Sequence, residues 1–207
     1  MDVNDKPSAV RTGEELDTER VEQFLLENIE GLSGPLRIQQ FASGYSNLTY
    51  LMRMGEHELV LRRPPFGRKA RTAHDMGREY RILKALEGVF PYAPRVLTYS
   101  EDDSVIGCPF YVMDRIKGII LRRDLPDGLS LDADQMRSLC ENLVDVHLEL
   151  HRVDYRSVGL ENLGKPDAYV TRQVEGWSER YRAARTPDAP LFETVMGWLL
   201  DAKPPDS

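Results

Sequence analysis

Residues 36–63 read LRIQQFASGYSNLTYLMRMGEHELVLRR, and this stretch decides the fold. Three short runs in it are rich in β-prone residues, namely Leu36–Phe41, Leu48–Met54 and Glu58–Arg62. The runs are separated by Ala-Ser-Gly-Tyr-Ser-Asn and by Met-Gly-Glu-His, which have the composition of turns. The stretch therefore predicts a three-stranded antiparallel meander.

The flanking segments extend this meander into a β-β-β-α-β-β lobe. Before it, apolar residues recur at helical spacing from Val21 to Ile29, with Asp17 or Thr18 as the N-cap. After it, the pattern predicts a helix between about His74 and Leu86, and Gly88 follows where such a helix would stop. Two further strands are predicted in the segments Arg95–Ser100 and Phe110–Asp114.

The remainder of the chain has a helical pattern. Apolar and histidine residues from Met136 to His151 share one helical face, and further helices are predicted near Asp167–Ala184 and Leu191–Leu200. We therefore predict an α+β protein with three parts. These are an N-terminal extension with a helix (1–34), a β-rich lobe (35–115) and a partial helical lobe (116–207).

Composition limits the partners and the location. The chain is 41% hydrophobic and 29% charged, as in ordinary globular domains. Its net charge of -7 would repel nucleic acid and anionic membranes, so we expect neither as a partner. Two cysteines cannot build a disulfide framework, and the sequence starts without a signal-peptide pattern and has no long apolar run. We expect an intracellular, cytoplasmic protein.

The turn Gly44-Tyr45-Ser46-Asn47 between the first two predicted strands is a candidate phosphate-binding loop. A glycine lets backbone N–H groups approach a phosphate closely, and Ser46 and Asn47 add side-chain donors. The alternative is a plain hairpin loop, in which Gly and Asn supply positive φ angles. The local sequence leaves both interpretations open.

Arg62 and Glu79 form a candidate ion pair at the same site. Arg62 ends the third predicted strand and could direct a positive charge toward phosphates beneath the loop. Glu79 lies on the following predicted helix and could hold that cation extended. Taken singly, each is equally typical of a solvated surface side chain.

Six segments together resemble the aminoglycoside phosphotransferase family, whose fold is related to that of protein kinases. In order, these segments are FASGYSNLTYLM (41–52), LVLRRPP (59–65), GREYRILKAL (77–86), APRVL (93–97), PFYVMDRIKG (109–118) and LVDVHLELHRVD (143–154). Within the family, the chain is most similar to kinase-like domains fused to, or encoded beside, acyl-CoA dehydrogenases. The resemblance implies a two-lobed kinase-like fold, ATP and Mg²⁺ as cofactors, and phosphoryl transfer to a hydroxyl of a small molecule.

The resemblance also implies roles for particular residues. Gly44, Ser46 and Asn47, with Tyr45 in the same turn, would cover the ATP phosphates, and Glu79 would pair with Arg62. Many members of the family have Lys where this chain has Arg62, and a guanidinium is not a neutral replacement for an ammonium. The lobe-connecting hinge would run from Tyr111 to Arg115 through Asp114, with adenine bonded to the backbone near Met113.

One family motif is missing from the sequence. The family's catalytic loop reads approximately His-Gly-Asp, with Asn five residues later and a metal-binding Asp downstream, and these residues carry most of the catalysis. No histidine of this chain is followed by Gly-Asp. We therefore expect no catalytic or metal-binding residues in this chain, a truncated product or fragment, and no activity from it alone. The alternative is a non-catalytic nucleotide-binding or protein-interaction module.

Four weaker patterns give further expectations. His147 and His151 share a helical face but lack the metalloprotease spacing, so a metal site is the less favoured interpretation. The basic residues between Arg62 and Arg71 could contact phosphates of ATP or of an acyl-CoA, or form a solvated loop. Trp177 and Trp198 are expected to be core residues. Apolar helical faces that include Leu139, Leu143 and Leu199 are expected to cause self-association.

Overall fold

The computed structural model describes residues 6–41, 47–66, 74–121, 124–126, 128–164 and 167–204. The chain divides into two compact units, Met1–Val158 and Gly159–Ser207, and each is described separately. The boundaries predicted after residues 34 and 115 separate an N-terminal extension and two lobes, and they do not correspond to the division between these compact units. They stay predictions.

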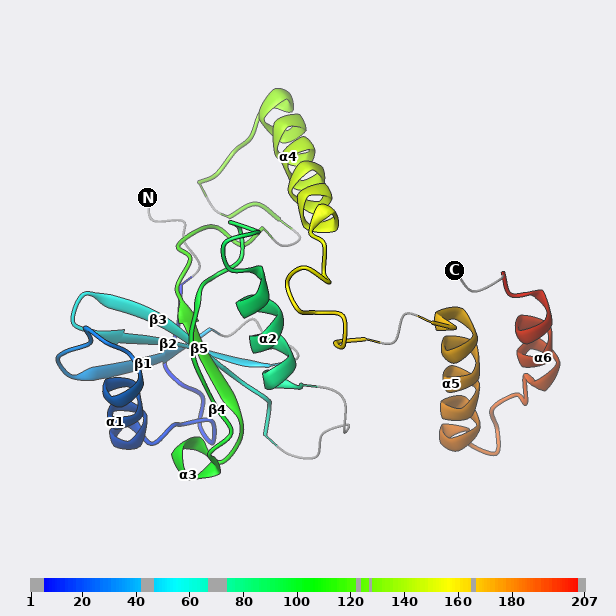
Figure 1. The fold of residues 1–207 in the computed structure, drawn as a ribbon, viewed down its shortest axis with the longest axis horizontal. Helices are drawn as coiled ribbons and strands as arrows, with labels where there is room; N and C mark the ends of the chain where they lie inside the picture. The colour runs from blue at the N-terminus through cyan, green and yellow to red at the C-terminus, as the bar shows by residue number, and fades with distance from the viewer. Residues whose placement is uncertain are drawn as a thin grey trace. The chain divides into compact units, whose positions relative to one another are not determined.

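The first unit is built around a five-stranded antiparallel sheet with strand order β1-β2-β3-β5-β4 (Figure 1). The helix α2 precedes β4 in the chain, so the predicted β-β-β-α-β-β order is confirmed. The strands are β1 (Leu36–Gln40), β2 (Leu48–Met54), β3 (His57–Arg63), β4 (Val96–Ser100) and β5 (Phe110–Asp114).

A tight hairpin joins β2 to β3. Met54 pairs with His57, so Gly55 and Glu56 form a two-residue loop. Gly55 has a φ of 58°, and a Cβ there would lie 2.9 Å from the carbonyl oxygen of Ser33. Only glycine meets both demands, because other residues adopt positive φ at a cost and would clash. This hairpin fixes the register of β3 against β2, and therefore the face of the sheet on which each residue from Leu59 to Arg63 lies.

Both faces of the sheet are covered, each by a different helix. Residues Leu59 and Leu61 of β3 share one hydrophobic cluster with α1 (Thr18–Asn28), whose Val21 and Leu25 are fully buried. Residues that alternate with them along the strands face the other way, because strand side chains alternate between faces. On that second face, Tyr111 of β5 clusters with Met76 of α2 (Met76–Leu86).

The N-terminal segment is attached to the sheet by more than its helix. Ser8 and Gln40 exchange backbone hydrogen bonds of 2.8 and 3.0 Å, which adds an isolated bridge beside β1. The side chain of Gln40 is fully buried, and it donates to Glu14 and accepts from the N–H of Arg11. Buried polar groups are tolerated when they are bonded in this way. Residues before the meander are therefore part of the same folded unit.

Aspartates cap the starts of α1 and α2, and of the two only Asp17 was predicted. Asp17 caps α1 by accepting from the N–H of Arg20, and Asp75 caps α2 by accepting from the N–H of Arg78. These caps satisfy backbone donors that have no partner within the helix. A further short helix, α3 (Asp103–Ile106), lies between β4 and β5 and is not predicted by the sequence pattern.

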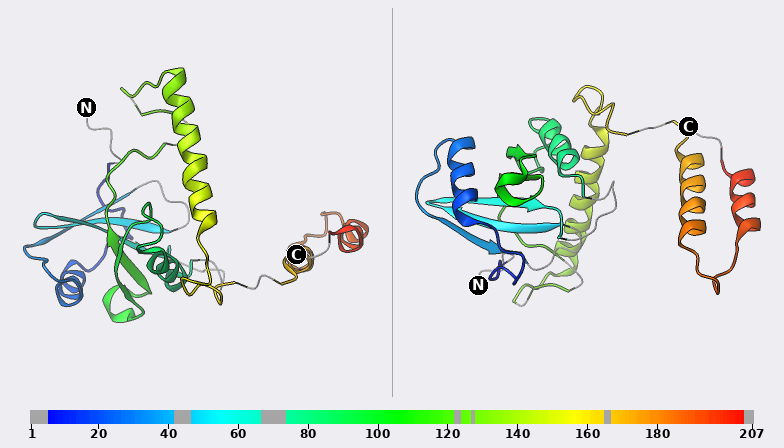
Figure 2. Two further views of the ribbon diagram at one scale, coloured as in Figure 1. Left: turned by 45° about the horizontal axis from the view of Figure 1, so that its top comes forward. Right: turned by 90° about the horizontal axis from the view of Figure 1, so that it is seen from below.

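Three more helices complete the described structure, and their positions agree with the predicted helical regions. Helix α4 (Ala133–Arg152) begins with a capping box between Asp132 and Gln135 and buries none of its residues. In the second unit, α5 (Tyr169–Ala184) and α6 (Glu193–Ala202) lie side by side, as Figure 2 shows. Among the described residues, no helix is both long and apolar enough to cross a bilayer.

The two tryptophans differ from expectation. Trp177 of α5 is 63% exposed and Trp198 of α6 is 64% exposed, so neither is a core residue here. Both lie on helices, as predicted. Two helices packed side by side can bury only the faces that they turn to each other, which explains why their other faces remain in solvent.

Candidate functional site

The strands β1 and β2 form the first hairpin of the chain. The end of the loop between these two strands contacts helix α2. Asn47 lies just before β2, is 6% exposed, and donates a 2.7 Å hydrogen bond from Nδ2 to Oε1 of Glu79. The structure thus brings together two of the predicted site residues. Gly44, Tyr45 and Ser46, which were predicted to continue this loop, lie outside the described residues.

The second carboxylate oxygen of Glu79 faces the sheet. Its Oε2 accepts a 3.0 Å hydrogen bond from the hydroxyl of Tyr111 and lies 3.5 Å from Nη2 of Arg62. Arg62 and Tyr111 are direct neighbours across β3 and β5. One carboxylate therefore gathers donors from the first hairpin, the third strand and the fifth strand, and the predicted proximity of Arg62 and Glu79 is confirmed.

The guanidinium of Arg62 is only partly satisfied. Its Nε is buried and has no hydrogen-bond partner among the described residues, and 3.5 Å to Glu79 is long for a charge-assisted hydrogen bond. Guanidinium carries five N–H donors and stays charged, so the part of it that remains exposed favours an anionic partner. The side chain is 32% exposed, which leaves part of it accessible. This arrangement fits a phosphate group.

Tyr111 acts as a fixed hydrogen-bond donor. Burial is the main cause that raises the pKa of its hydroxyl well above the ordinary value, and the nearby Glu79 carboxylate raises it further while Arg62 opposes the shift. A phenol with a raised pKa remains protonated at neutral pH. Tyr111 can therefore donate to Glu79 throughout the physiological range.

The predicted hinge residues are engaged in contacts of their own. The N–H of Asp114 donates to the carbonyl of Arg95 at 2.9 Å, and the N–H of Arg115 donates to that of Glu58 at 3.3 Å. Met113 pairs with Val60 in β3 and with Val96 in β4. The amides of Asp114 and Arg115 thus have partners already, and the adenine contact predicted for this segment stays a prediction.

Glu58 forms ion pairs with three cations, of which Arg115 is the last residue of the predicted hinge. Its carboxylate lies 2.9 Å from Arg53 and 3.0 Å from each of Arg115 and Lys117. The hydrogen bond from Arg53, helped by Lys117 and Arg115 and opposed by burial, lowers the pKa of Glu58 to about 2. The charged form of Glu58 is therefore favoured in the folded state.

A consequence for acid stability can be measured. Because the folded pKa lies below the usual 4.5, the stabilisation from Glu58 is complete above pH 4.5 and is lost as the pH falls toward 2. We expect the stability difference between wild type and Glu58→Gln to shrink over this range. Urea unfolding at a series of pH values would measure it, and a difference that is constant with pH would contradict the assignment.

Arg63 does not belong to a solvent-exposed basic patch. It is 4% exposed, its guanidinium lies 3.8 Å from the ring centre of Phe66, and its Nε donates to the carbonyl of Pro64. Because side chains alternate along β3, Arg63 and Arg62 lie on opposite faces of the sheet. The other basic residues of this segment, Arg68, Lys69 and Arg71, lie outside the described residues.

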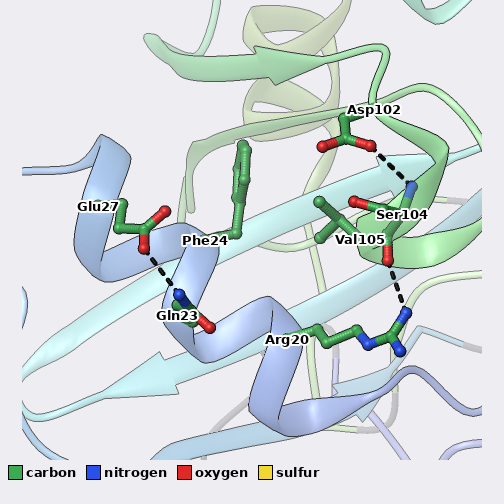
Figure 3. A pocket seen from close by; sticks show the side chains of 7 residues that line it. All are labelled: Arg20, Gln23, Phe24, Glu27, Asp102, Ser104 and Val105. Carbon is green, nitrogen blue, oxygen red and sulfur yellow. Dashed lines mark hydrogen bonds between the residues drawn. The ribbon is translucent and has the colours of Figure 1, made fainter.

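A separate cavity lies between α1 and α3. It has a volume of about 410 Å³ and is lined by Arg20, Gln23, Phe24, Glu27, Asp102, Ser104 and Val105. Figure 3 shows Arg20 donating to the carbonyl of Ser104 and Gln23 donating to Glu27. None of the predicted site residues lines this cavity. The polar network around Glu79, with its unfilled donor, therefore remains the candidate site.

One member of the network was missed by the sequence analysis. Nδ1 of His74 lies 2.7 Å from Oδ1 of Asn47, so His74 is connected to Glu79 through one side chain. No sequence pattern indicates this contact, because His74 precedes the helix and is distant from Asn47 along the chain. The contact depends on a backbone conformation that only the structure reveals.

The two histidines of α4 lie together, with ring centres 4.2 Å apart. Within the described part of the chain, no group of three or more His, Cys, Asp and Glu side chains is arranged to hold a metal ion. We assign no metal ligands to these histidines.

Known proteins are similar to this chain in sequence and in fold. The model of the family described as "Phosphotransferase enzyme family" matches residues 37–207. Acyl-CoA dehydrogenase family member 10 of Mus musculus is 38% identical over 81% of this chain and 15% of its own length. Acyl-CoA dehydrogenase family member 11 of Gallus gallus is 35% identical over 100% of this chain and 27% of its own length. The chain thus spans only a small part of these relatives.

Solved structures of phosphotransferases are also similar to this chain. A crystal structure of a candidate aminoglycoside phosphotransferase from Ralstonia eutropha is similar, with a TM-score of 0.71 and 32% identity. The match covers 90% of this chain and 54% of that one. A macrolide 2'-phosphotransferase of type I matches with a TM-score of 0.51 and 18% identity, which is a likeness of fold.

Proposed function

The chain belongs to the phosphotransferase enzyme family, and from this premise we propose that it is the ATP-binding part of a small-molecule kinase. The complete protein would transfer a phosphoryl group from MgATP to a hydroxyl group of its substrate. Its fold is the kinase-like α+β fold of these phosphotransferases. The acceptor and the dependence on ATP are parts of the proposal.

The observation that supports it most directly is the convergence on Glu79. Asn47 and Tyr111 donate to its carboxylate, and Arg62 lies beside it with an unfilled buried donor. Phosphoryl transfer depends chiefly on positioning and on neutralising phosphate charge. In the proposed complex, Arg62 contacts a phosphate, and Glu79 holds the Arg62 side chain in place. Asn47, together with Gly44, Tyr45 and Ser46, covers the phosphates.

Magnesium would neutralise charge on the bound phosphates when the nucleotide is present. The sequence of this chain has no His-Gly-Asp motif, and we assign no catalytic base and no Mg²⁺ ligands within it. We propose that residues 1–207 alone bind the nucleotide without transferring phosphate. A non-catalytic nucleotide-binding or interaction module is the second candidate, and the missing motif is the observation that favours it.

Calorimetric titration of the purified chain with MgATP tests the proposal. We expect saturable binding with one site, and we expect an Arg62→Ala variant to bind more weakly because it removes the partly satisfied guanidinium. Absence of binding to the correctly folded wild type would contradict the proposed function. Transfer activity in a longer protein that includes residues 1–207 would distinguish the kinase from the non-catalytic module.

The substrate class can be tested separately. We propose that an acyl-CoA is among the candidate ligands, because the relatives are acyl-CoA dehydrogenase family members and the sequence next to Arg62 adds the basic residues Arg68, Lys69 and Arg71. Charge reversal of Lys69 and Arg71 to Glu should then weaken acyl-CoA binding in the complete protein by roughly tenfold, since removing charge-assisted hydrogen bonds to phosphate lowers affinity. Equilibrium binding of a labelled acyl-CoA would measure this, and unchanged affinity would exclude the contact.

We also propose self-association through helix α4. Leu143 is 70% exposed and Val144 is 56% exposed, and both follow Leu139 on a helix with no buried residue. Exposed apolar faces of this kind favour association. Sedimentation should show dimers or larger species at high protein concentration, and Leu143→Glu should reduce them. A wild type that remains monomeric would contradict the proposal.

The location is proposed as cytoplasmic. Cys108 is buried and Cys140 is exposed, and both are thiols, which is the state expected in a reducing compartment.

A further inference from the structure

His74 has an unusual backbone conformation beside the candidate site. Its φ of 69° lies in the left-handed region, which costs energy for a residue with a side chain. It directly precedes Asp75, the N-cap of the helix that carries Glu79. Strained residues persist when their surroundings hold them, and such residues are found preferentially at functional sites.

The hydrogen bonds around Asn47 fix which group donates. A carboxylate only accepts, so the amide nitrogen of Asn47 must face Glu79, and the amide oxygen Oδ1 must face His74. An amide oxygen also only accepts, so Nδ1 of His74 must carry a proton. The contacts therefore form a directed chain in which His74 donates to Asn47 and Asn47 donates to Glu79.

The ring of His74 is not needed to cap helix α2. Asp75 already performs that role, because its Oδ1 accepts from the N–H of Arg78 at 2.8 Å. The contact of the ring with Asn47 is 2.7 Å long and spans 27 residues of sequence. It joins the start of α2, the helix that carries Glu79, to Asn47 at the end of the first hairpin, which is proposed to cover the phosphates.

We propose that His74 is a positioning residue for nucleotide binding. Through Asn47 it sets the orientation of the Glu79 carboxylate, and Glu79 in turn holds Arg62 toward the phosphate. This inference rests on the proposed ATP-binding function. It goes beyond that function by giving His74, which has no motif around it, a specific task in the site.

Two substitutions separate the ring from the backbone conformation. His74→Gly removes the ring and accepts the positive φ without strain, whereas His74→Asn keeps a donor near the position of Nδ1 and also tolerates this conformation. We expect His74→Gly to weaken MgATP binding by roughly tenfold, the loss expected when one hydrogen bond to a site residue is removed. His74→Asn should recover most of the affinity.

A double-mutant cycle tests the path through Asn47. If His74 acts only by orienting Asn47, then adding His74→Gly to an Asn47→Ala background should change MgATP affinity little, whereas independent effects would add. Additive losses would overturn the proposed path. Thermal unfolding of each variant shows whether the fold is kept, and a purely structural role would lower the unfolding temperature without this dependence on Asn47.

The tautomer of His74 gives a readout that does not involve nucleotide. Long-range ¹H–¹⁵N NMR of the neutral imidazole should show the proton on Nδ1, and a proton on Nε2 would overturn the directed chain. Wild type that binds MgATP together with a His74→Gly variant of equal affinity would refute the role of His74 and leave the proposed function intact. Wild type that does not bind MgATP would remove both.

Discussion

Replacing Glu79 with glutamine is expected to weaken MgATP binding by about a hundredfold, which corresponds to about 3 kcal/mol. The carboxylate accepts from Asn47 and Tyr111 and lies beside Arg62. A glutamine amide has only one accepting oxygen. Its NH₂ group, which donates, would therefore face either the donor of Asn47 or the donors of Tyr111 and Arg62. The substitution also removes the charge that holds Arg62, and hydrogen bonds to charged groups contribute roughly 1.5–3 kcal/mol each.

The matched control is Glu27→Gln on helix α1. This change removes the same charge from a helix, but Glu27 accepts an exposed hydrogen bond from Gln23 of the same helix and lies outside the Glu79 network. We expect MgATP affinity of this control to equal that of wild type. Calorimetric titration of both variants, with thermal unfolding to verify folding, measures the effect. An affinity of Glu79→Gln within about twofold of wild type would remove Glu79 from the phosphate site.

The strands of the sheet were predictable because their local signals agree with their burial. Leu48–Met54 and Phe110–Asp114 were predicted with the boundaries that the structure has. Both are flanked by residues typical of turns and bends, and both contribute fully buried side chains. The predicted cap residue Asp17 precedes a helix whose apolar spacing is regular. In these segments propensity, pattern and packing favour the same structure.

The opposite placement of Arg62 and Arg63 shows what the sequence alone leaves open. Adjacent strand residues point to opposite faces, so one arginine must face α2 and the other must face away. Composition alone does not decide which. The structure places Arg62 beside Glu79 and packs Arg63 against Phe66, because Leu59 and Leu61 set the side of the sheet that belongs to α1.

Other features depend on contacts that no local pattern encodes. Helix α3 has only four residues, too few for a helical periodicity to be visible. The contact of His74 with Asn47 depends on a positive φ at a residue that seldom adopts one. The exposure of Trp177 was mispredicted because aromatic residues on an amphipathic helix are usually buried. In the described part of the unit Gly159–Ser207, α5 and α6 are the only helices that can pack on each other.

Replacing Leu25 with alanine is expected to lower the free energy of unfolding by about 3 kcal/mol. Leu25 is fully buried in the cluster that joins α1 to Tyr50, Leu61 and Phe110 of the sheet. A large-to-small change at such a site reduces both burial and packing, because the cavity left behind closes only in part. Chemical denaturation of the two proteins measures the difference.

Leu26→Ala is the matched control, since Leu26 is the next residue of the same helix and is 47% exposed. We expect this control to cost about 0.5 kcal/mol or less. Similar losses of stability for both variants would mean that α1 does not pack on the sheet as described. Because α1 covers the face of the sheet opposite Tyr111 and Glu79, folded Leu25→Ala protein should keep its MgATP affinity. Loss of stability without loss of affinity would thus separate the face that supports the fold from the face proposed to bind nucleotide.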